Sequence, residues 1–388
     1  MRWTEEKIGS FCDTGSGGTP SRDRAAEFYG GSIPWVKSGE LRESIVSQTA
    51  ESLTAAGLAN SSAKIVPPGA LLVAMYGATV GRVGILGIQA ATNQAVCHII
   101  PRAERADTRY LFHCLQAKLP VFLSRSVGGA QPNISQEIIK DTLVPLPPLE
   151  EQRRIAAILD KADVLRQKRR AALQKLDSLT QSLFLDMFGD PLVNDKKWPV
   201  RPFGNELVDI KYGTGTPPEY SAEPDIPFIR ATNIKNGTVQ SDGLKFISPA
   251  EAAKIEKCKL SYGDLIIVRS GVNAGDCGLI PKKFSGAYAG YDLIVRLDLN
   301  KAYFYNFLLN SSFGQRLLEP LTRRAAQPHL NADQVKGLNM IAPPAVLIVD
   351  FAEKLMAVDR IRKQEASNLN NQIILFSSLQ HRAFRGEL

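Results

Sequence analysis

The chain of 388 residues is long enough for two or three domains. Its hydrophobic fraction of 44% is ordinary for a folded protein, no apolar run approaches the roughly 20 residues needed to span a bilayer, and the first residues lack the apolar core of a secretion signal. The formal net charge of +8 fits an acidic partner such as nucleic acid but does not require one.

Residues 1–148 consist of short apolar runs cut by Gly and Pro. Leu71 to Met75 predicts a buried strand, and the glycines after it predict a turn into a second strand. Residues 110–119 predict a helix. These elements favour a mixed α/β (α+β) domain with a curved sheet over a doubly wound one.

Residues 149–188 predict one long helix. Its interior contains no Gly or Pro, Pro147-Pro148 precedes it, and Gly189-Asp190-Pro191 ends it. Its apolar residues recur every three or four positions with Arg169 as the interruption, which predicts a coiled-coil seam. The expected seam residues are Ile155, Ala162, Leu165, Arg169, Leu176, Leu179 and Leu183.

The second half of the chain repeats the first at a shift of roughly 196 residues. Gly18-Thr19-Pro20 recurs as Gly215-Thr216-Pro217, and residues 33–37 recur as residues 226–230. We therefore expect a second domain over 189–344 and a second long helix over 345–388. The expected seam of this helix is Phe351, Leu355, Val358, Ile361, Glu365, Leu369, Leu375 and Leu379.

The order of these regions predicts that the two long helices pack antiparallel. The first helix ends where the second domain begins, so a parallel pair would require that domain to span the whole helix length. A pseudo-two-fold axis across the pair would bring Arg169 opposite Glu365, its equivalent in the repeat. The alternative is that the two charges are solvated independently.

Two motifs complete this arrangement: residues 145–152, PLPPLEEQ, before the first long helix, and residues 383–388, AFRGEL, at the end. The arrangement resembles, over the whole chain, the specificity (S) subunit of type I restriction-modification systems. The resemblance implies that each domain is a target recognition domain for one half of an asymmetric bipartite site on double-stranded DNA. It also implies that the helices set the domain spacing and dock two modification (methyltransferase) subunits, with restriction (nuclease/translocase) subunits in the full complex.

The resemblance further implies a cytoplasmic, non-catalytic chain without its own cofactor, whose partner methyltransferase uses S-adenosylmethionine. The residues agree, since no Pro-Pro pair lies in a [DN]PP[YF] motif and no nucleotide-binding loop is present. Neither the four histidines nor the five cysteines have metal-ligand spacing, so reduced thiols and no metal are expected. The second copy has Pro343-Pro344-Ala345-Val346-Leu347 in place of the acidic helix start, which predicts unequal docking of the two modification subunits.

Contacts to DNA are expected from polar and basic residues in the loops, because phosphates attract Lys and Arg, while Arg, Lys, Asn and Gln read base edges. Arg269, Asn273, Arg323 and Arg324 are the leading candidates, since each flanks a glycine or a loop boundary. Gln131 and Gln327 recur in both copies, which favours a structural or phosphate role for them. The candidates are Thr19, Ser21, Arg22, Arg24, Lys37, Tyr76, Arg82, Arg125, Gln131, Asn133, Thr216, Tyr220, Arg230, Thr232, Asn233, Lys235, Arg269, Asn273, Arg323, Arg324, Gln327 and His329.

Three classes of function remain in competition at this point. The first is a DNA-reading subunit that directs partner enzymes. The second is a methyltransferase acting alone, and the third is a coiled-coil scaffold whose domains bind proteins. The repeat, the seam and the motifs together favour the first.

Overall fold

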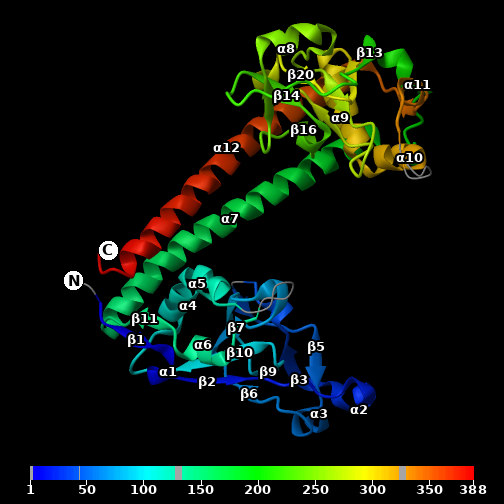
Figure 1. The fold of residues 1–388 in the computed structure, drawn as a ribbon. Helices are drawn as coiled ribbons and strands as arrows, with labels where there is room; N and C mark the ends of the chain where they lie inside the picture. The colour runs from blue at the N-terminus through cyan, green and yellow to red at the C-terminus, as the bar shows by residue number, and fades with distance from the viewer. Residues whose placement is uncertain (1–2, 43, 127–132, 323–328) are drawn as a thin grey trace. The chain divides into compact units, whose positions relative to one another are not determined.

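The computed structural model describes the chain except for residues 1–2, 43, 127–132 and 323–328 (Figure 1). It divides into unit 1, Met1–Ala171 with Ser367–Leu388, and unit 2, Ala172–Ala366. Each unit contains a mixed α/β domain and part of both long helices, α7 (Leu149–Phe188) and α12 (Ala345–Ala383). The expected fold class is confirmed. The domain bounds and the pseudo-two-fold axis stay predictions.

The domain of unit 1 is built on two sheets. The larger has the order β2 (Cys12–Ser16), β10 (Val96–Pro101), β7 (Leu71–Ala74), β8 (Val83–Leu86) and β4 (Ile45–Val46). The smaller has the order β5 (Glu51–Leu53), β3 (Tyr29–Val36), β9 (Ala90–Thr92) and β6 (Ile65–Val66), while β1 (Glu5–Lys7) pairs with β11 (Leu143–Pro145). The helices of this domain are α1 (Ile8–Phe11), α2 (Ala25–Phe28), α3 (Ala55–Ala59), α4 (Thr108–Ala117), α5 (Leu119–Ser124) and α6 (Gln136–Lys140).

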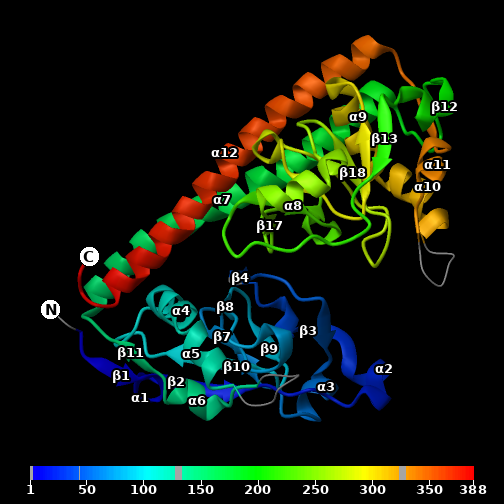
Figure 2. The same ribbon diagram turned by 45° about the horizontal axis from the view of Figure 1, so that its top comes forward.

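The domain of unit 2 repeats this plan. Its larger sheet has the order β13 (Asp209–Tyr212), β21 (Leu293–Arg296), β18 (Leu265–Ile267), β19 (Cys277–Leu279), β16 (Gly237–Val239) and β15 (Ile234–Lys235). The smaller is β17 (Lys245–Ile247), β14 (Ile226–Ile229) and β20 (Tyr288–Ala289), and β12 (Val200–Pro202) pairs with β22 (Asn339–Ile341). The helices are α8 (Pro249–Lys254), α9 (Leu299–Asn310), α10 (Ser312–Thr322) and α11 (Ala332–Lys336), and α9 contacts β19 and β16 (Figure 2).

The turn predicted after Leu71 to Met75 is a β-hairpin in both units. Strands β7 and β8 pair antiparallel with Leu71 opposite Ile85, and β18 and β19 do the same in unit 2. Gly271 and Gly275 lie between β18 and β19 with φ of 83° and 94°, a region that L-residues with side chains rarely adopt. The glycines of this motif therefore shape the turn of a hairpin.

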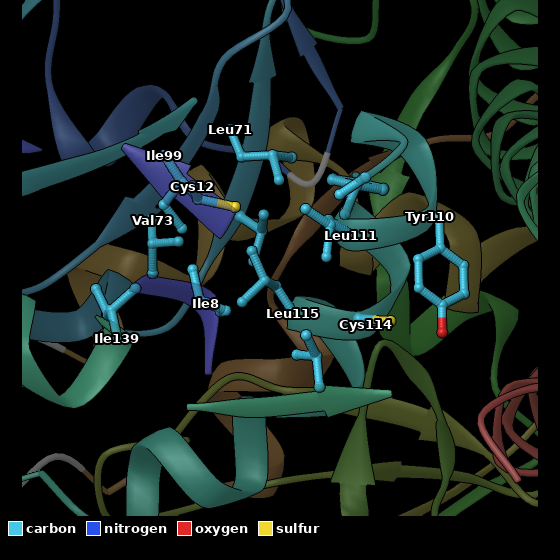
Figure 3. Close-up of a cluster of buried hydrophobic side chains, with 14 of the residues drawn as sticks. Ile8, Cys12, Leu71, Val73, Ile99, Tyr110, Leu111, Cys114, Leu115 and Ile139 are labelled. Carbon is cyan, nitrogen blue, oxygen red and sulfur yellow. The ribbon is translucent and has the colours of Figure 1, made fainter. Parts of the chain in front are cut away.

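The helix predicted over 110–119 is α4, which begins two residues earlier. The Asp107 carboxylate accepts hydrogen bonds from the backbone N–H groups of Arg109 and Tyr110, so it caps this end. Figure 3 shows Leu111 and Leu115 of α4 turned toward the strands, and both residues belong to the buried core of unit 1. Burying this apolar face against the sheet is the main stabilisation available to so short a helix.

All five cysteines are buried and free, as expected. Cys12 and Cys114 lie in the core of unit 1 (Figure 3). Burial raises the pKa of the Cys114 thiol to about 12. A thiol with so high a pKa is unreactive, so these side chains serve as small apolar groups.

Within each unit the two long helices run in opposite directions. In unit 1, Arg154 near the start of α7 donates to the backbone oxygen of Leu388 at 3.1 Å, and Arg166 farther along α7 stacks 3.7 Å from the ring centroid of Phe376. In unit 2, Phe184 packs on Phe351 with ring centroids 5.6 Å apart. As residue numbers rise along α7 they fall along α12, which confirms the antiparallel packing within each unit.

The seam between the helices differs from the expected one at four of its fifteen positions. Leu165, Leu179, Ile361 and Leu375 face solvent, with 50–57% of their surface exposed, so the prediction was wrong for these four residues. The buried or half-buried stripes follow a strict heptad spacing instead. They comprise Ile155, Leu159, Ala162, Arg166, Arg169, Leu173, Leu176, Thr180, Leu183 and Met187 on α7, and Phe351, Leu355, Val358, Arg362, Glu365, Leu369, Gln372, Phe376, Leu379 and Ala383 on α12.

Polar residues at inward positions explain the error. Arg166 occupies a seam position because its guanidinium lies over the ring of Phe376 and pairs with Asp163 one turn earlier. Arg362, its equivalent in the repeat, pairs with Asp359 and, at 3.1 Å, with Asp177. Counting apolar residues alone therefore selects the apolar neighbours of Arg166, Thr180 and Arg362. Leu375 lies beside the apolar Phe376, so this reason does not apply to it.

Two tryptophans tie the helix ends to the domains at equivalent places of the repeat. Trp198 Nε1 donates to the Phe188 carbonyl oxygen at the end of α7 at 2.8 Å. Trp3 Nε1 donates to the Ala383 carbonyl oxygen at the end of α12 at 3.1 Å, so the first described residue lies beside the end of α12 in unit 1 (Figure 1). These bonds satisfy carbonyl groups that a helix end leaves without partners.

Candidate nucleic-acid interface

A cluster of aromatic rings around one arginine lies on the domain of unit 2. The Arg269 guanidinium sits between the rings of Tyr212 and Tyr291, 4.4 Å from each centroid, and its Nε donates to the Leu330 oxygen at 3.0 Å. Both tyrosines are exposed over roughly two fifths of their surface. The cluster offers a held positive charge and flat aromatic faces, the groups on which phosphates bind and bases stack.

Two further candidates lie beside this cluster. His329 pairs through a β-bridge with Ser270, and its ring lies 6.4 Å from that of Tyr291. Asn273 is half-buried in the turn between β18 and β19. The structure therefore brings His329 to the region of Arg269 and Asn273, although it is distant from them in the sequence.

The tip of the same turn carries a residue that the sequence did not single out. Val272 is fully exposed, between glycines that adopt positive φ. An apolar side chain held at the tip of a hairpin, next to a basic and aromatic cluster, resembles the wedges that proteins insert between base pairs. Its position after the first turn glycine was the only available sequence signal.

Tyr220 and Arg230 also lie together, with the Arg230 guanidinium 5.9 Å from the Tyr220 ring centroid. Thr216, Thr232 and Lys235 are exposed on neighbouring loops. Asn233 is fully buried, and its side chain accepts from the Arg230 N–H and donates to the Asp242 oxygen. The prediction that Asn233 contacts DNA is therefore wrong, because its buried side-chain amide forms hydrogen bonds that stabilise this turn.

The basic candidates of unit 1 are arranged differently, because acidic neighbours hold them. Arg22 lies 4.1 Å from the ring centroid of Tyr29 and pairs with Glu51 at 2.8 Å, and Lys37 binds the other oxygen of the same carboxylate. These two cations hold the pKa of Glu51 below its usual value, the Lys37 hydrogen bond having the largest effect.

The remaining candidates of unit 1 are exposed. Arg24 pairs with Glu27, Thr19 contacts Gln94, and the Ser21 hydroxyl accepts from the Asp23 N–H. Tyr76 forms a β-bridge with Asn133, while the side chains of Arg82 and Arg125 are exposed. Gln131, Arg323, Arg324 and Gln327 lie outside the described residues.

Comparison with known proteins decides between the three classes of function. A family model for the type I restriction modification DNA specificity domain matches residues 1–175 and 197–373. The chain belongs to this family. It is a specificity subunit of the type I restriction-modification kind, which recognises a DNA target and leaves catalysis to other subunits.

Related sequences and structures agree with this assignment. The MjaIX specificity subunit of Methanocaldococcus jannaschii is 25% identical over 374 residues, which cover 90% of this chain and 85% of that protein. The EcoBI specificity subunit of Escherichia coli is 26% identical over 77% of this chain and 69% of its own length. The S subunit of M. genitalium has the same fold, with a TM-score of 0.63 at 13% identity over 99% of this chain and 96% of its own.

In this specificity subunit the motif before α7 has a structural role. Gln152 is fully buried, and its side-chain oxygen accepts from the Asp107 N–H at 2.8 Å while its nitrogen donates to the oxygens of Arg105 and Pro147. The equivalent residue of the second copy is Ile348, which packs in the core of unit 2. Each copy thus joins its helix to its domain, one through polar contacts and the other through apolar ones.

The described residues include no group of three or more His, Cys, Asp or Glu that could hold a metal ion. Over the same part of the chain, no helix is both long and apolar enough to cross a membrane.

Proposed function

We propose that the two domains of this specificity subunit each read one half of an asymmetric, bipartite DNA target. The observation that carries the proposal is a repeated fold with different surface chemistry. Arg269 in unit 2 is held by two exposed tyrosines, whereas Arg22 in unit 1 lies on Tyr29 and is neutralised by Glu51. Domains of one shape that present different side chains suit two half-sites of different sequence.

The long helices would dock two modification subunits, which would use S-adenosylmethionine as the methyl donor. Four exposed apolar residues on the long helices support this docking: Leu165, Leu179, Ile361 and Leu375. They form two pairs at equivalent places of the repeat. In unit 1, Arg166 of α7 faces Phe376 of α12 across the seam. Leu165 and Leu375 each come one residue before these two, so antiparallel packing places both on the same side of the helix pair. Leu179 and Ile361 are their equivalents in unit 2. Exposed apolar residues that recur in this way fit a surface covered by a partner.

DNA retention by the purified subunit tests this proposal against the two alternatives. We expect the subunit with its modification partner to retain duplex DNA carrying the target, with an affinity that falls steeply as salt rises because counterions are released. Methyl transfer by this chain alone would favour an enzyme. Absence of DNA retention with and without the partner would favour a protein-binding scaffold. The free buried thiols fit a reducing, cytoplasmic location.

A further inference from the structure

The domain of unit 2 contains a hollow beside the Arg269 cluster. Its volume is about 320 Å³, and it lies between the loop that precedes β14 and the segment that follows β20. Tyr220, Phe228, Arg230, Tyr291 and Asp292 provide its principal side chains. A space of this size accepts a flat heterocycle.

The walls of the hollow are aromatic. Phe228 is buried, and its ring centroid lies 6.0 Å from that of Tyr220. Tyr220 and Tyr291 are each exposed over roughly two fifths of their surface, so they offer ring faces that nothing in the described chain covers completely. Rings placed in this way stack on a planar ligand.

The polar groups of the hollow include one charged donor and one acid. The Nε of Arg230 is buried and has no hydrogen-bond partner among the described residues, although the other end of its guanidinium donates to the Gly243 oxygen at 2.7 Å. Asp292 is 3% exposed, and one carboxylate oxygen accepts from the Arg269 N–H at 3.2 Å. A donor and an acceptor that line the same hollow match the ring nitrogen and the amino group on the pairing edge of adenine or cytosine.

Burial raises the pKa of Asp292 to about 6, against the opposing effect of Arg269. The carboxylate therefore costs stability at neutral pH. A buried acid with a raised pKa that lines a hollow is a candidate for a ligand contact.

The equivalent place in unit 1 is built differently. The pairing of β14 with β20 matches that of β3 with β9, so Phe228 corresponds to Trp35, Tyr291 to Gln94 and Asp292 to Ala95. Trp35 Nε1 donates to the Gly18 oxygen at 3.1 Å, and Gln94 contacts Thr19. In unit 1 the larger Trp35 replaces Phe228, Trp35 and Gln94 make internal contacts, and the acid is replaced by Ala95.

We propose that the hollow of unit 2 binds a single amino-bearing nucleobase, adenine or cytosine, that has left the stack of the bound DNA. The inference rests on the proposed function, because the base comes from the target duplex. Tyr220 and Tyr291 stack on the base, while Asp292 and Arg230 contact its pairing edge. A protein that takes up an extruded base binds more tightly when the base is already unpaired, since the cost of opening the pair is removed.

The test uses the full chain with its modification subunit and a duplex that carries the target. Each base of the target in turn is placed opposite an abasic site, and the affinity is compared with that of the matched duplex. We expect about tenfold tighter binding, equivalent to about 1.4 kcal/mol, at one position in one half-site. Tyr220→Ala and Asp292→Asn should remove this gain, and Tyr220→Phe should keep it.

Tyr262→Ala is the matched control, because Tyr262 is an exposed tyrosine of the same unit outside the hollow. It should keep the gain. No gain in affinity at any position, or a gain that persists in Tyr220→Ala and Asp292→Asn, would overturn the inference. The proposed function would still stand in that case if the complex binds the matched duplex. Failure of the wild-type complex to retain the matched duplex would overturn both. The nucleobase could instead come from a small molecule, so the complex is also titrated with adenosine and with S-adenosylmethionine. Micromolar binding of either one that depends on Asp292 would contradict the proposal that the base comes from DNA.

Discussion

Asp292 is a buried carboxyl group whose pKa is raised from 3.8 to about 6. The folded chain therefore holds this proton more tightly than the unfolded chain does. The stability that the protonated form provides is present below about pH 4 and is lost as the pH rises through 6.

Asp292→Asn should raise the free energy of unfolding by about 1–3 kcal/mol at pH 8, because the amide carries no charge and keeps an oxygen for the Arg269 N–H. The difference should shrink as the pH falls toward 4.5. Urea unfolding of the two proteins at both pH values measures it. An increase that is the same at both values would show that the charge is not responsible.

Residue-level roles were the part of the site that sequence could predict least. Arg269 was selected because it stands next to a glycine turn, and it does lie in an exposed aromatic cluster. Asn233 was also chosen as a DNA-contact candidate because it is a polar residue in a predicted loop, yet its side-chain amide is buried within a turn. A polar side chain in a loop has the same sequence signal whether it faces DNA or the backbone, so only the fold separates the two cases.

At the scale of elements, the long helices and the hairpin could be predicted, whereas four of the fifteen seam positions could not. The positions Ile155, Ala162 and Leu176 were correct because a strict seven-residue spacing fixes one stripe. The second stripe contains Arg166 and Thr180, which carry no apolar signal. The neighbouring leucines drew the prediction one residue away, onto the exposed face.

Arg166→Ala should destabilise the chain by about 3 kcal/mol. The change removes the guanidinium from the ring of Phe376 and leaves Asp163, whose side chain is only 13% exposed, without its cation. Leu165→Ala, one residue away on the exposed face, is the control and should change stability by less than about 0.5 kcal/mol. Equal losses in the two variants would contradict the revised seam.

The predicted approach of Arg169 and Glu365 is tested by a charge exchange. If the two face each other, Arg169→Glu alone should destabilise far more than Arg169→Glu combined with Glu365→Arg, because the exchange restores opposite charges. Thermal unfolding of the wild type, both single variants and the double variant completes the cycle. Equal midpoints for the single and double variants would count against the pairing.

At the scale of the whole molecule, the repeat assigns each unit its own exposed apolar pair. Leu165→Glu with Leu375→Glu should weaken binding of the modification subunit at least tenfold, since burying a carboxylate against an apolar partner is costly. Sedimentation of the mixture measures the stoichiometry. The same substitutions should leave the melting temperature of the subunit alone nearly unchanged. Undiminished assembly of two modification subunits would place the docking surface elsewhere.

The central claim is that two related domains read two different halves of one DNA target. Mapping of methylated bases across the genome, in cells that contain this subunit and its modification partner, tests it most directly. We predict a split, asymmetric motif that disappears when the subunit is deleted, and that loses stringency in one half only when Arg269 is changed to Ala. A continuous or palindromic motif, or methylation that persists without the subunit, would contradict the account.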